Sequence, residues 1–460
     1  MVPTRSDPTL SRMTEGIGGP LGRHAEPGVV PPRFFTVERV LVLLVGLSAV
    51  LAVLFKDHCR QVGWLTPDQF STTCASDIVA AGPGTDTPLA PLTSLLAALT
   101  GWLSGAQPAD AAGTLRFFDL NAGLIVVAWL LGVLALARSN RLRPWDAAVF
   151  AASPLLLFSA YASWDLWVAA LIGIGLFLFS RRTFFDAGLV LGVAGAMHPV
   201  AALTVTAAVV LAVRRARESR ASYGLGAGRL EAGPALAVGP LLVGGVLSWL
   251  AITVASFVLF PTRWLAYWVV PWTDPPAEGS LYGAVNALVA KLGVEAFSGS
   301  DALVVSAALL IIGLVGLLLI AARTPLPPRL AALAFVLTAW ALLVDKHAGP
   351  QQAVWLLPLL ALARPRWKTV LCWQALALAY YLAYLLHLGV IRGDNNTQHG
   401  IDGPYYALVV LSFDLGTLVL IVLVCREMFQ PWRDQIRRGG VDDPLMAPEQ
   451  LVAQGPAPLS

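Results

Sequence analysis

Residues 39–55, RVLVLLVGLSAVLAVLF, decide the fold, because they form the first of many apolar runs in the chain. Beyond Arg39 this run carries no charged residue, which is typical of a helix inside a bilayer. Of the 460 residues, 57% are hydrophobic and 13% are charged, whereas a soluble domain averages about 25% charged. Because similar apolar blocks recur along the chain, the sequence predicts an all-α polytopic membrane protein.

The apolar blocks predict about twelve transmembrane helices, although several are shorter than the ~20 residues that a perpendicular helix needs. Short or broken helices are tolerated where they line a water-filled cavity. The apolar stretch 88–104 is interpreted as an interfacial helix, because a span there would invert every later loop. The predicted spans are residues 39–55, 117–137, 145–160, 164–180, 184–197, 199–213, 235–260, 301–322, 329–344, 352–363, 369–390 and 404–425.

Basic residues predict the orientation, since cytoplasmic loops of membrane proteins are enriched in Lys and Arg. With a cytoplasmic N-terminus, the inner segments hold 24 of the 31 Lys and Arg residues, and the outer segments hold seven. Every inner segment is basic, and an even number of spans returns the C-terminus to the same side. The sequence therefore predicts a multi-pass plasma-membrane protein with both termini cytoplasmic.

The polar ends of the chain predict two disordered cytoplasmic tails, because they lack long apolar runs and are rich in Pro. The first tail covers residues 1–33 and has no apolar run that would mark a cleavable signal peptide. The second tail covers residues 429–460. Residues 34–428 are expected to form one membrane domain, which includes residues 56–116 as the first outer loop with its interfacial helix.

The first long polar interruption is residues 56–87, KDHCRQVGWLTPDQFSTTCASDIVAAGPGTDT, which the topology places on the outer face. Cys59 and Cys74 lie fifteen positions apart in this loop, so they are either joined in a disulfide or two unpaired thiols. Asp77 follows, between small and apolar residues. A carboxylate there could remove a proton from a sugar hydroxyl as a general base. The alternative is a helix-capping or solvated aspartate.

Further polar residues gather at the outer ends of the predicted spans: Trp164, Asp165, His198, Lys346 and His347. Ionisable groups at membrane depth are costly and usually mark a pathway or a site. An outer-face cavity lined by carboxylates, histidines and tryptophans is therefore expected. Lys346 suits a phosphate group, or alternatively it extends its charge to the interface.

An aromatic run follows Arg263 and holds Trp264, Tyr267, Trp268 and Trp272. It is interpreted either as an interfacial aromatic belt or as an amphipathic loop that covers the cavity and stacks on sugar rings or a prenyl chain. Arg263, near the head of the run, could pair with a phosphate.

Several chemistries find no support in the sequence. There is no GxGxxG, no Walker P-loop, no CxxC pair and no HExxH. Nucleotide and structural-zinc sites are therefore not expected, and no soluble domain is large enough to bind a nucleotide-sugar. An activated donor would have to come from within the membrane. Neither a metal, a separate cofactor nor a nucleic-acid partner is expected.

Four segments occur in an order that indicates a family. They are CASDIVA (74–80), SWDLWVAAL (163–171), EGSLYGAVNAL (278–288) and DKHAGPQQAVWLLPL (345–359). They resemble the first-loop SD/TD-I motif, the WDL helix start, the GS-aromatic segment and the N-K-x-x-S-P-Q-Y-x-x-W-L-L-P motif of glycosyltransferase family 87. This is an actinobacterial family of GT-C type membrane enzymes that includes alpha-mannosyltransferases of envelope glycolipids.

Two departures from the family pattern stand out. Many members carry a Lys after the fifth helix, where this chain has Met197 and His198. The Ser and Tyr of the S-P-Q-Y element are Gly349 and Gln352 here. These changes would be consistent with a different sugar or acceptor, or with lost activity.

The resemblance implies a mechanism on the extracytoplasmic side. A sugar, mannose in the first instance, would pass with inversion from a polyprenyl-phosphate donor to a glycolipid or lipoglycan acceptor, with Asp77 as the general base. Stabilisation of the departing phosphate would supply much of the catalysis. The donor phosphate would be held by Lys346, Arg263 and His198. Substrate-binding roles would fall to Asp165, Trp164, His347, Gln351, Ser280 and Tyr282.

Two other functions compete with this interpretation. A transporter or lipid flippase would share the intramembrane polar groups, but it should show matched internal repeats, and none is evident between residues 39–213 and 235–425. A non-catalytic envelope scaffold is the other alternative, favoured by the missing Lys at Met197.

Overall fold

The computed structural model describes residues 36–85, 87–107, 110–140, 143–223, 233–393, 400–440 and 442–446. The chain divides into two units, residues 1–40 and 41–460. Of the first unit, the structure describes residues 36–40, which include the first turn of helix α2 (Val37–Leu54). The predicted tail 1–33 lies outside the described residues. Every regular element in the described part of the chain is a helix, as the apolar blocks predict.

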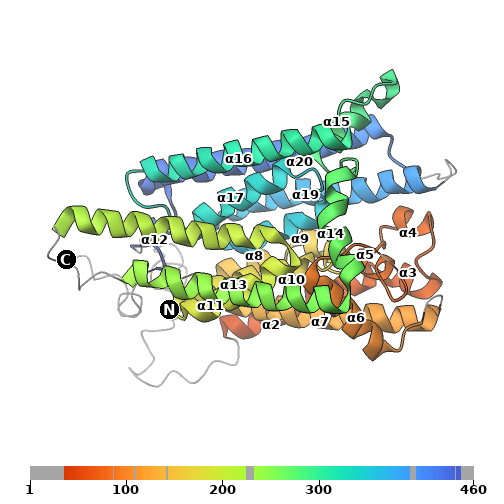
Figure 1. Ribbon diagram of the computed structural model, residues 1–460, viewed down its shortest axis with the longest axis horizontal. Coiled ribbons are helices and arrows are strands. Elements are labelled where there is room, and N and C mark those ends of the chain that lie inside the picture. The colour runs from red at the N-terminus through yellow and green to blue at the C-terminus, as the bar shows by residue number, and fades with distance from the viewer. Residues whose placement is uncertain are drawn as a thin grey trace, which may run out of the picture. The chain divides into compact units, whose positions relative to one another are not determined.

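Within the residues that the structure describes, seven helices are long and apolar enough to cross a membrane. An all-helical chain with several such helices is a membrane protein, since helices satisfy their own backbone hydrogen bonds in lipid. In Figure 1, α12, α13, α16 and α20 run in nearly the same direction. The seven helices are α2, α7 (Ala111–Ser139), α12 (Ala202–Tyr223), α13 (Gly233–Leu259), α16 (Gly299–Arg323), α19 (Trp367–Arg392) and α20 (Gly403–Phe429).

The remaining predicted spans fall on shorter helices. Helices α17 and α18 are buried along almost their whole length, so they pack among other helices rather than facing lipid. All twelve predicted segments are helical, but a count of twelve membrane crossings stays a prediction. The shorter elements are η2 (Pro144–Ala147), α8 (Ala148–Ala151), α9 (Pro154–Ser159), α10 (Asp165–Ser180), α11 (Phe184–Met197), η3 (Pro199–Ala201), α17 (Leu330–Val344), η5 (Pro350–Trp355) and α18 (Leu356–Ala363).

Glycines allow two of these helices to approach closely. Helix α11 packs along α13. A Cβ atom added at Gly188 or Gly192 would collide with the backbone of α13 at Leu241 or Gly245. Small residues at such positions are typical of helix pairs in membranes, where close backbone contact replaces the hydrophobic driving force.

Short helices join the long ones at the end of the bundle where α13 finishes. The stretch 88–104, predicted as an interfacial helix, forms α6 (Pro91–Ser104). The aromatic run is helical rather than a loop: it forms α14 (Pro261–Thr273), which crosses the direction of α13 and α16 (Figure 1). Its alternative role as an interfacial aromatic belt stays a prediction. The other short helices are α3 (Asp57–Val62), α4 (Asp68–Ser71), α5 (Asp77–Ala80), α15 (Leu281–Val289) and η4 (Ala290–Leu292).

The residues after α20 differ from the predicted tail. Residues 429–440 and 442–446 fold against the bundle and include η6 (Pro431–Arg433) and η7 (Arg437–Gly439). Arg329, at the start of α17, donates hydrogen bonds to both carboxylate oxygens of Asp434 at 2.6 and 3.1 Å. Asp443 accepts from the Leu330 backbone N–H at 2.9 Å. Buried polar contacts hold this segment in place of apolar packing. Its low hydrophobicity therefore led to the prediction of disorder.

Candidate functional site

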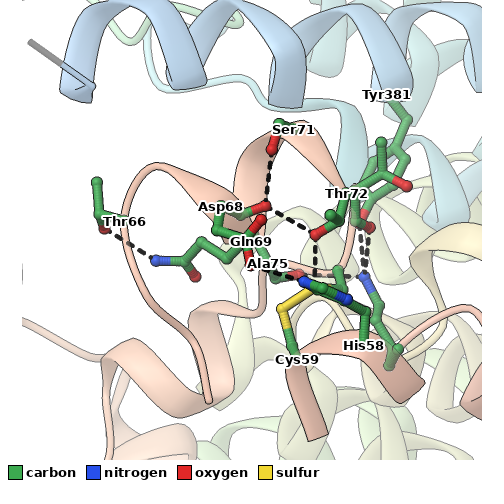
Figure 2. Close-up of a disulfide and its surroundings, with 12 residues drawn as sticks. His58, Cys59, Thr66, Asp68, Gln69, Ser71, Thr72, Ala75 and Tyr381 are labelled. Atoms are coloured by element: carbon green, nitrogen blue, oxygen red, sulfur yellow. Dashed lines mark hydrogen bonds and ion pairs between the residues drawn. A yellow bond between two sulfur atoms is a disulfide. The ribbon is translucent and has the colours of Figure 1, made fainter. Parts of the chain in front are cut away.

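The segment before Asp77 is held in place by a disulfide and by a buried lysine. Cys59 and Cys74, for which the sequence left two alternatives, are joined in a disulfide, with Cα atoms 5.8 Å apart (Figure 2). Closing a 15-residue loop in this way stabilises the folded chain by about 3 kcal/mol. Next to Cys59 in the chain, His58 Nε2 lies 2.6 Å from an Asp68 carboxylate oxygen.

The buried lysine is Lys56, which the sequence did not indicate as a residue of the site. Its side chain is fully buried. The ammonium group donates to the backbone oxygens of Thr73 and Ala75 at 3.3 and 3.1 Å, and to the Tyr381 hydroxyl at 3.2 Å. Thr73 and Ala75 flank Cys74, so the disulfide and Lys56 hold the same three residues.

Backbone contacts bring Asp77 to the start of α10. The Ser76 hydroxyl donates to the Tyr161 oxygen, and the Asp77 N–H donates to the Ala162 oxygen, both at 2.7 Å. The chain that follows Ala162 leads to Asp165, the first residue of α10. Two carboxylates from distant parts of the sequence therefore lie within electrostatic range of each other.

The surroundings of Asp77 change its ionisation. Solvent reaches the side chain, but protein surrounds the carboxyl group closely enough that burial raises its pKa to about 6. The charge of Asp165 raises the pKa further, while Arg392 and Lys56 lower it. Burial lowers the pKa of Lys56 to about 7, against the opposing attraction of Asp77. A carboxylate with a pKa near 6 is well suited to accept a proton at neutral pH.

A pH profile tests the link between Lys56 and Asp77. Any activity that needs ionised Asp77 should rise with pH through about 6 and level off above it. Lys56→Gln removes a positive charge that favours the carboxylate, so the pKa of Asp77 should increase and the rising limb should move to higher pH. The variant should therefore lose more activity at about pH 5.5 than at about pH 8.

The matched control is Lys291→Gln, since Lys291 is exposed and paired with Asp402 on the surface. Equal losses at both pH values would show that Lys56 acts only on stability.

A cavity of about 840 Å³ lies beside Asp165. Apolar residues of α16 and α17 form much of its wall, among them Leu310 and Leu342. Its aromatic residues come from three parts of the chain: three from α14, one from the residue before α10 and one from the end of η5. The aromatic residues that line the cavity are Trp164, Tyr267, Trp268, Trp272 and Trp355.

The polar lining of the cavity is acidic. Its carboxylates are Asp165, Asp274 and Asp345, and its imidazoles are His198 and His347. No Lys or Arg lines it among the described residues. Asp77 does not line this cavity either, although it interacts with Asp165, which does. The cavity and Asp77 are thus neighbouring regions that share one carboxylate.

His198 lines the cavity with a neutral side chain. Its ring packs against Trp355, with centroids 4.2 Å apart and planes tilted by 41°. Burial lowers its pKa to about 4, against the opposing effect of Asp345, so the imidazole is uncharged at neutral pH. Its Nδ1 atom accepts from the Val200 N–H at 3.3 Å, which leaves the ring proton on Nε2. His198 can therefore meet a phosphate as a hydrogen-bond donor, but not as a cation.

The two other residues predicted to hold phosphate point elsewhere. Lys346 is 2% exposed, and its ammonium donates to the backbone oxygens of Asp274 and Gly299 at 2.9 and 3.1 Å. The Arg263 guanidinium donates to the Thr85 backbone oxygen. Both cations hold loops beside the cavity without lining it, and their roles at a phosphate remain predictions.

The predicted substrate residues divide into two groups. Trp164, Asp165 and His347 line the cavity, and the Gln351 amide lies 3.3 Å from an Asp77 oxygen. Ser280 and Tyr282 do not reach either region. Ser280 caps α15 by accepting from the Gly283 N–H at 3.1 Å, and the Tyr282 hydroxyl donates to the Val344 oxygen at 3.1 Å. Both are buried, and their contacts are those of structural residues.

Arg392 is a second charged residue that the sequence analysis did not single out. It is the last residue of α19, it is exposed, and its charge lowers the pKa of Asp77. Its guanidinium lies 5.5 Å from the centre of the Phe70 ring. The signal that could have indicated it is its position as a basic residue on the predicted outer side, where few occur.

Comparisons with known proteins assign no family. No protein-family model, no curated protein and no solved structure matches the chain. In the part of the chain that the structure describes, no group of three or more His, Cys, Asp or Glu side chains could hold a metal ion. The fold and site define an all-helical membrane protein with a carboxylate and a large cavity beside each other at the end of its helices.

Proposed function

We propose that this protein is a membrane glycosyltransferase that moves a sugar, mannose in the first instance, from a polyprenyl-phosphate donor to an envelope glycolipid or lipoglycan. One observation carries the proposal: Asp77, with a pKa of about 6, interacts with a carboxylate that lines a large, mainly apolar and aromatic cavity. A base of this pKa can accept the proton of an acceptor hydroxyl as the sugar is transferred. The reaction would proceed on the extracytoplasmic side.

The cavity suits the lipid-linked half of such a reaction. Its volume of about 840 Å³ is within the range of pockets for small ligands, about 300–1,000 Å³. Aromatic faces such as Trp268 and Trp272 can stack on sugar rings, and the leucines of α16 and α17 can contact a prenyl chain. Arg392, exposed and close enough to influence Asp77, is a candidate to stabilise the charge on the departing phosphate.

A transporter or lipid flippase is the second candidate. The observation that favours it is the acidic cavity itself, where no Lys or Arg lines the wall among the described residues and His198 is neutral. Such a wall fits a cationic or neutral solute better than a phosphate. The two candidates differ in their product, because only the transferase makes a new glycosidic bond.

The experiment uses vesicles that contain the full chain, together with matched vesicles that lack it. They are given radiolabelled polyprenyl-phosphate-mannose and extracted envelope glycolipids, and the label in the glycolipid is measured. Transfer that depends on the protein supports the proposal, and an arabinofuranose donor is the second arm. Protein-dependent movement of a cationic or neutral solute across the bilayer, with no transfer from either donor, would establish the transporter instead.

A further inference from the structure

A second cavity, of about 330 Å³, lies at the other end of α19 from Asp77. Arg366 directly precedes α19, whereas Arg392, which acts on Asp77, is its last residue. A helix of 26 residues is about 39 Å long. That separation matches a bilayer with its polar surfaces, about 40–45 Å across. The second cavity is therefore a distinct site at the opposite membrane surface, which the basic residues predict to be cytoplasmic.

Positive charge dominates this cavity, which we name the arginine pocket. Five arginines and one glutamate line it: Arg364, Arg366, Arg426, Arg433, Arg438 and Glu427. Glu427 pairs with two of the arginines, Arg364 and Arg366. The other three have no carboxylate partner within ion-pair distance in the described part of the chain. The pocket thus retains an excess of positive charge that a bound anion would neutralise.

One arginine is buried with hydrogen-bonding capacity to spare. The Arg364 residue is 6% exposed, and its Nε atom is buried without a hydrogen-bond partner. The guanidinium groups that line the pocket match the geometry of phosphate oxygens.

The walls of the pocket are held in place before any ligand binds. The buried ion pair of Arg329 with Asp434 fixes the chain just after Arg433. The Arg366 guanidinium donates to the Arg433 backbone oxygen, and Arg438 Nε donates to the Trp432 backbone oxygen, both at 2.6 Å. A site whose cations are held by main-chain contacts loses little conformational entropy on binding.

Two tryptophans indicate where the ligand comes from. Trp432 lines the pocket and is 64% exposed, and Trp367, next to Arg366 in the chain, is 42% exposed. Exposed tryptophans are typical of the level of lipid headgroups. We propose that the arginine pocket binds the phosphate of an anionic phospholipid headgroup. Basic pockets between helices near the cytoplasmic surface favour such headgroups. This inference does not depend on the proposed transfer reaction.

Lipid binding to the purified full chain tests this site. Native mass spectrometry would compare phosphatidylglycerol with phosphatidylcholine of the same acyl chains. We expect the unchanged protein to prefer phosphatidylglycerol. Arg426→Gln/Arg433→Gln removes two charges that have no carboxylate partner, and it should weaken phosphatidylglycerol binding by about 30-fold, from about 1 kcal/mol for each basic residue near the surface. Thermal stability of the variant should be unchanged.

The control variant is Arg182→Gln/Arg323→Gln, which removes two exposed arginines on the same predicted side and outside the pocket. It should retain the phosphatidylglycerol preference. Equal binding of both lipids to the unchanged protein, or equal losses in both double variants, would overturn the proposal. Glycerol 3-phosphate and inorganic phosphate form the last arm, and competition by either at the concentration of the lipid would assign the pocket to a soluble anion instead.

Discussion

Asp77→Asn is expected to lower the rate of sugar transfer by about 10²–10⁴-fold, which is the usual contribution of a general base. Asparagine keeps the shape of the side chain, and its backbone N–H still donates to the Ala162 oxygen. The variant should therefore fold and bind the donor, with the loss in kcat rather than in KM. Initial rates at saturating donor, together with KM, measure this effect.

The matched control is Asp119→Asn. Asp119 lies on α7, is exposed, and pairs with Arg60 at 2.9 Å, so its removal changes one surface ion pair. Its effect on the rate should be small. Asp165→Asn is the informative third variant, because Asp165 shares the electrostatic environment of Asp77. If Asp165→Asn abolishes transfer and Asp77→Asn does not, the base is Asp165.

Asp434→Ala is expected to destabilise the protein by about 3–5 kcal/mol, the usual cost of removing one partner from a buried ion pair. Arg329 is 3% exposed and Asp434 is 6% exposed, so the charge left behind cannot recover its hydration. Arg329 also donates to the backbone oxygens of Leu362 and Ala363, which would remain. Unfolding of the protein in mixed micelles measures the loss.

The control for this prediction is Asp402→Ala. Asp402 pairs with Lys291 at 3.0 Å, and both side chains are more than half exposed. Removing an exposed pair should cost only about 0–1 kcal/mol. A further variant, Arg329→Leu/Asp434→Leu, replaces both charges but also removes the donors to the Leu362 and Ala363 oxygens, so it should regain only part of the stability. Equal stabilities of Asp434→Ala and Asp402→Ala would contradict a structural role for the buried pair.

The arrangement of apolar segments was predictable because the apolar runs are local. Segment 369–390 falls within α19 and 404–425 within α20, since each run by itself determines a helix. The fold of residues 429–446 was not predictable in the same way. Asp434 finds its partner 105 positions earlier in the chain, and no local pattern in a polar stretch indicates such a contact.

The site was predictable in its parts but not in its connections. Asp77 was a candidate because it lies between small and apolar residues in the first outer loop and resembles the aspartate of a family motif, and Trp164 and His198 because they lie at helix ends. Lys56 was missed because its burial depends on Tyr381, which is 325 positions away. For Lys346, sequence position indicated a free cation, whereas the folded chain engages it with two backbone oxygens. Sequence identifies which groups can ionise, and only tertiary contacts determine which of them remain open to a ligand.

The length of α19 restricts the membranes in which this protein can reside without deforming them. Arg366 and Arg392 bracket a helix of about 39 Å, and their charges must both stay in polar surroundings. A hydrocarbon core of about 30 Å leaves a few ångströms at each end for headgroups. A thicker bilayer would cover one of the two arginines with hydrocarbon. The free-energy cost of this mismatch would be a fraction of a kcal/mol for each ångström. The length of α19 therefore matches the protein to bilayers of ordinary thickness.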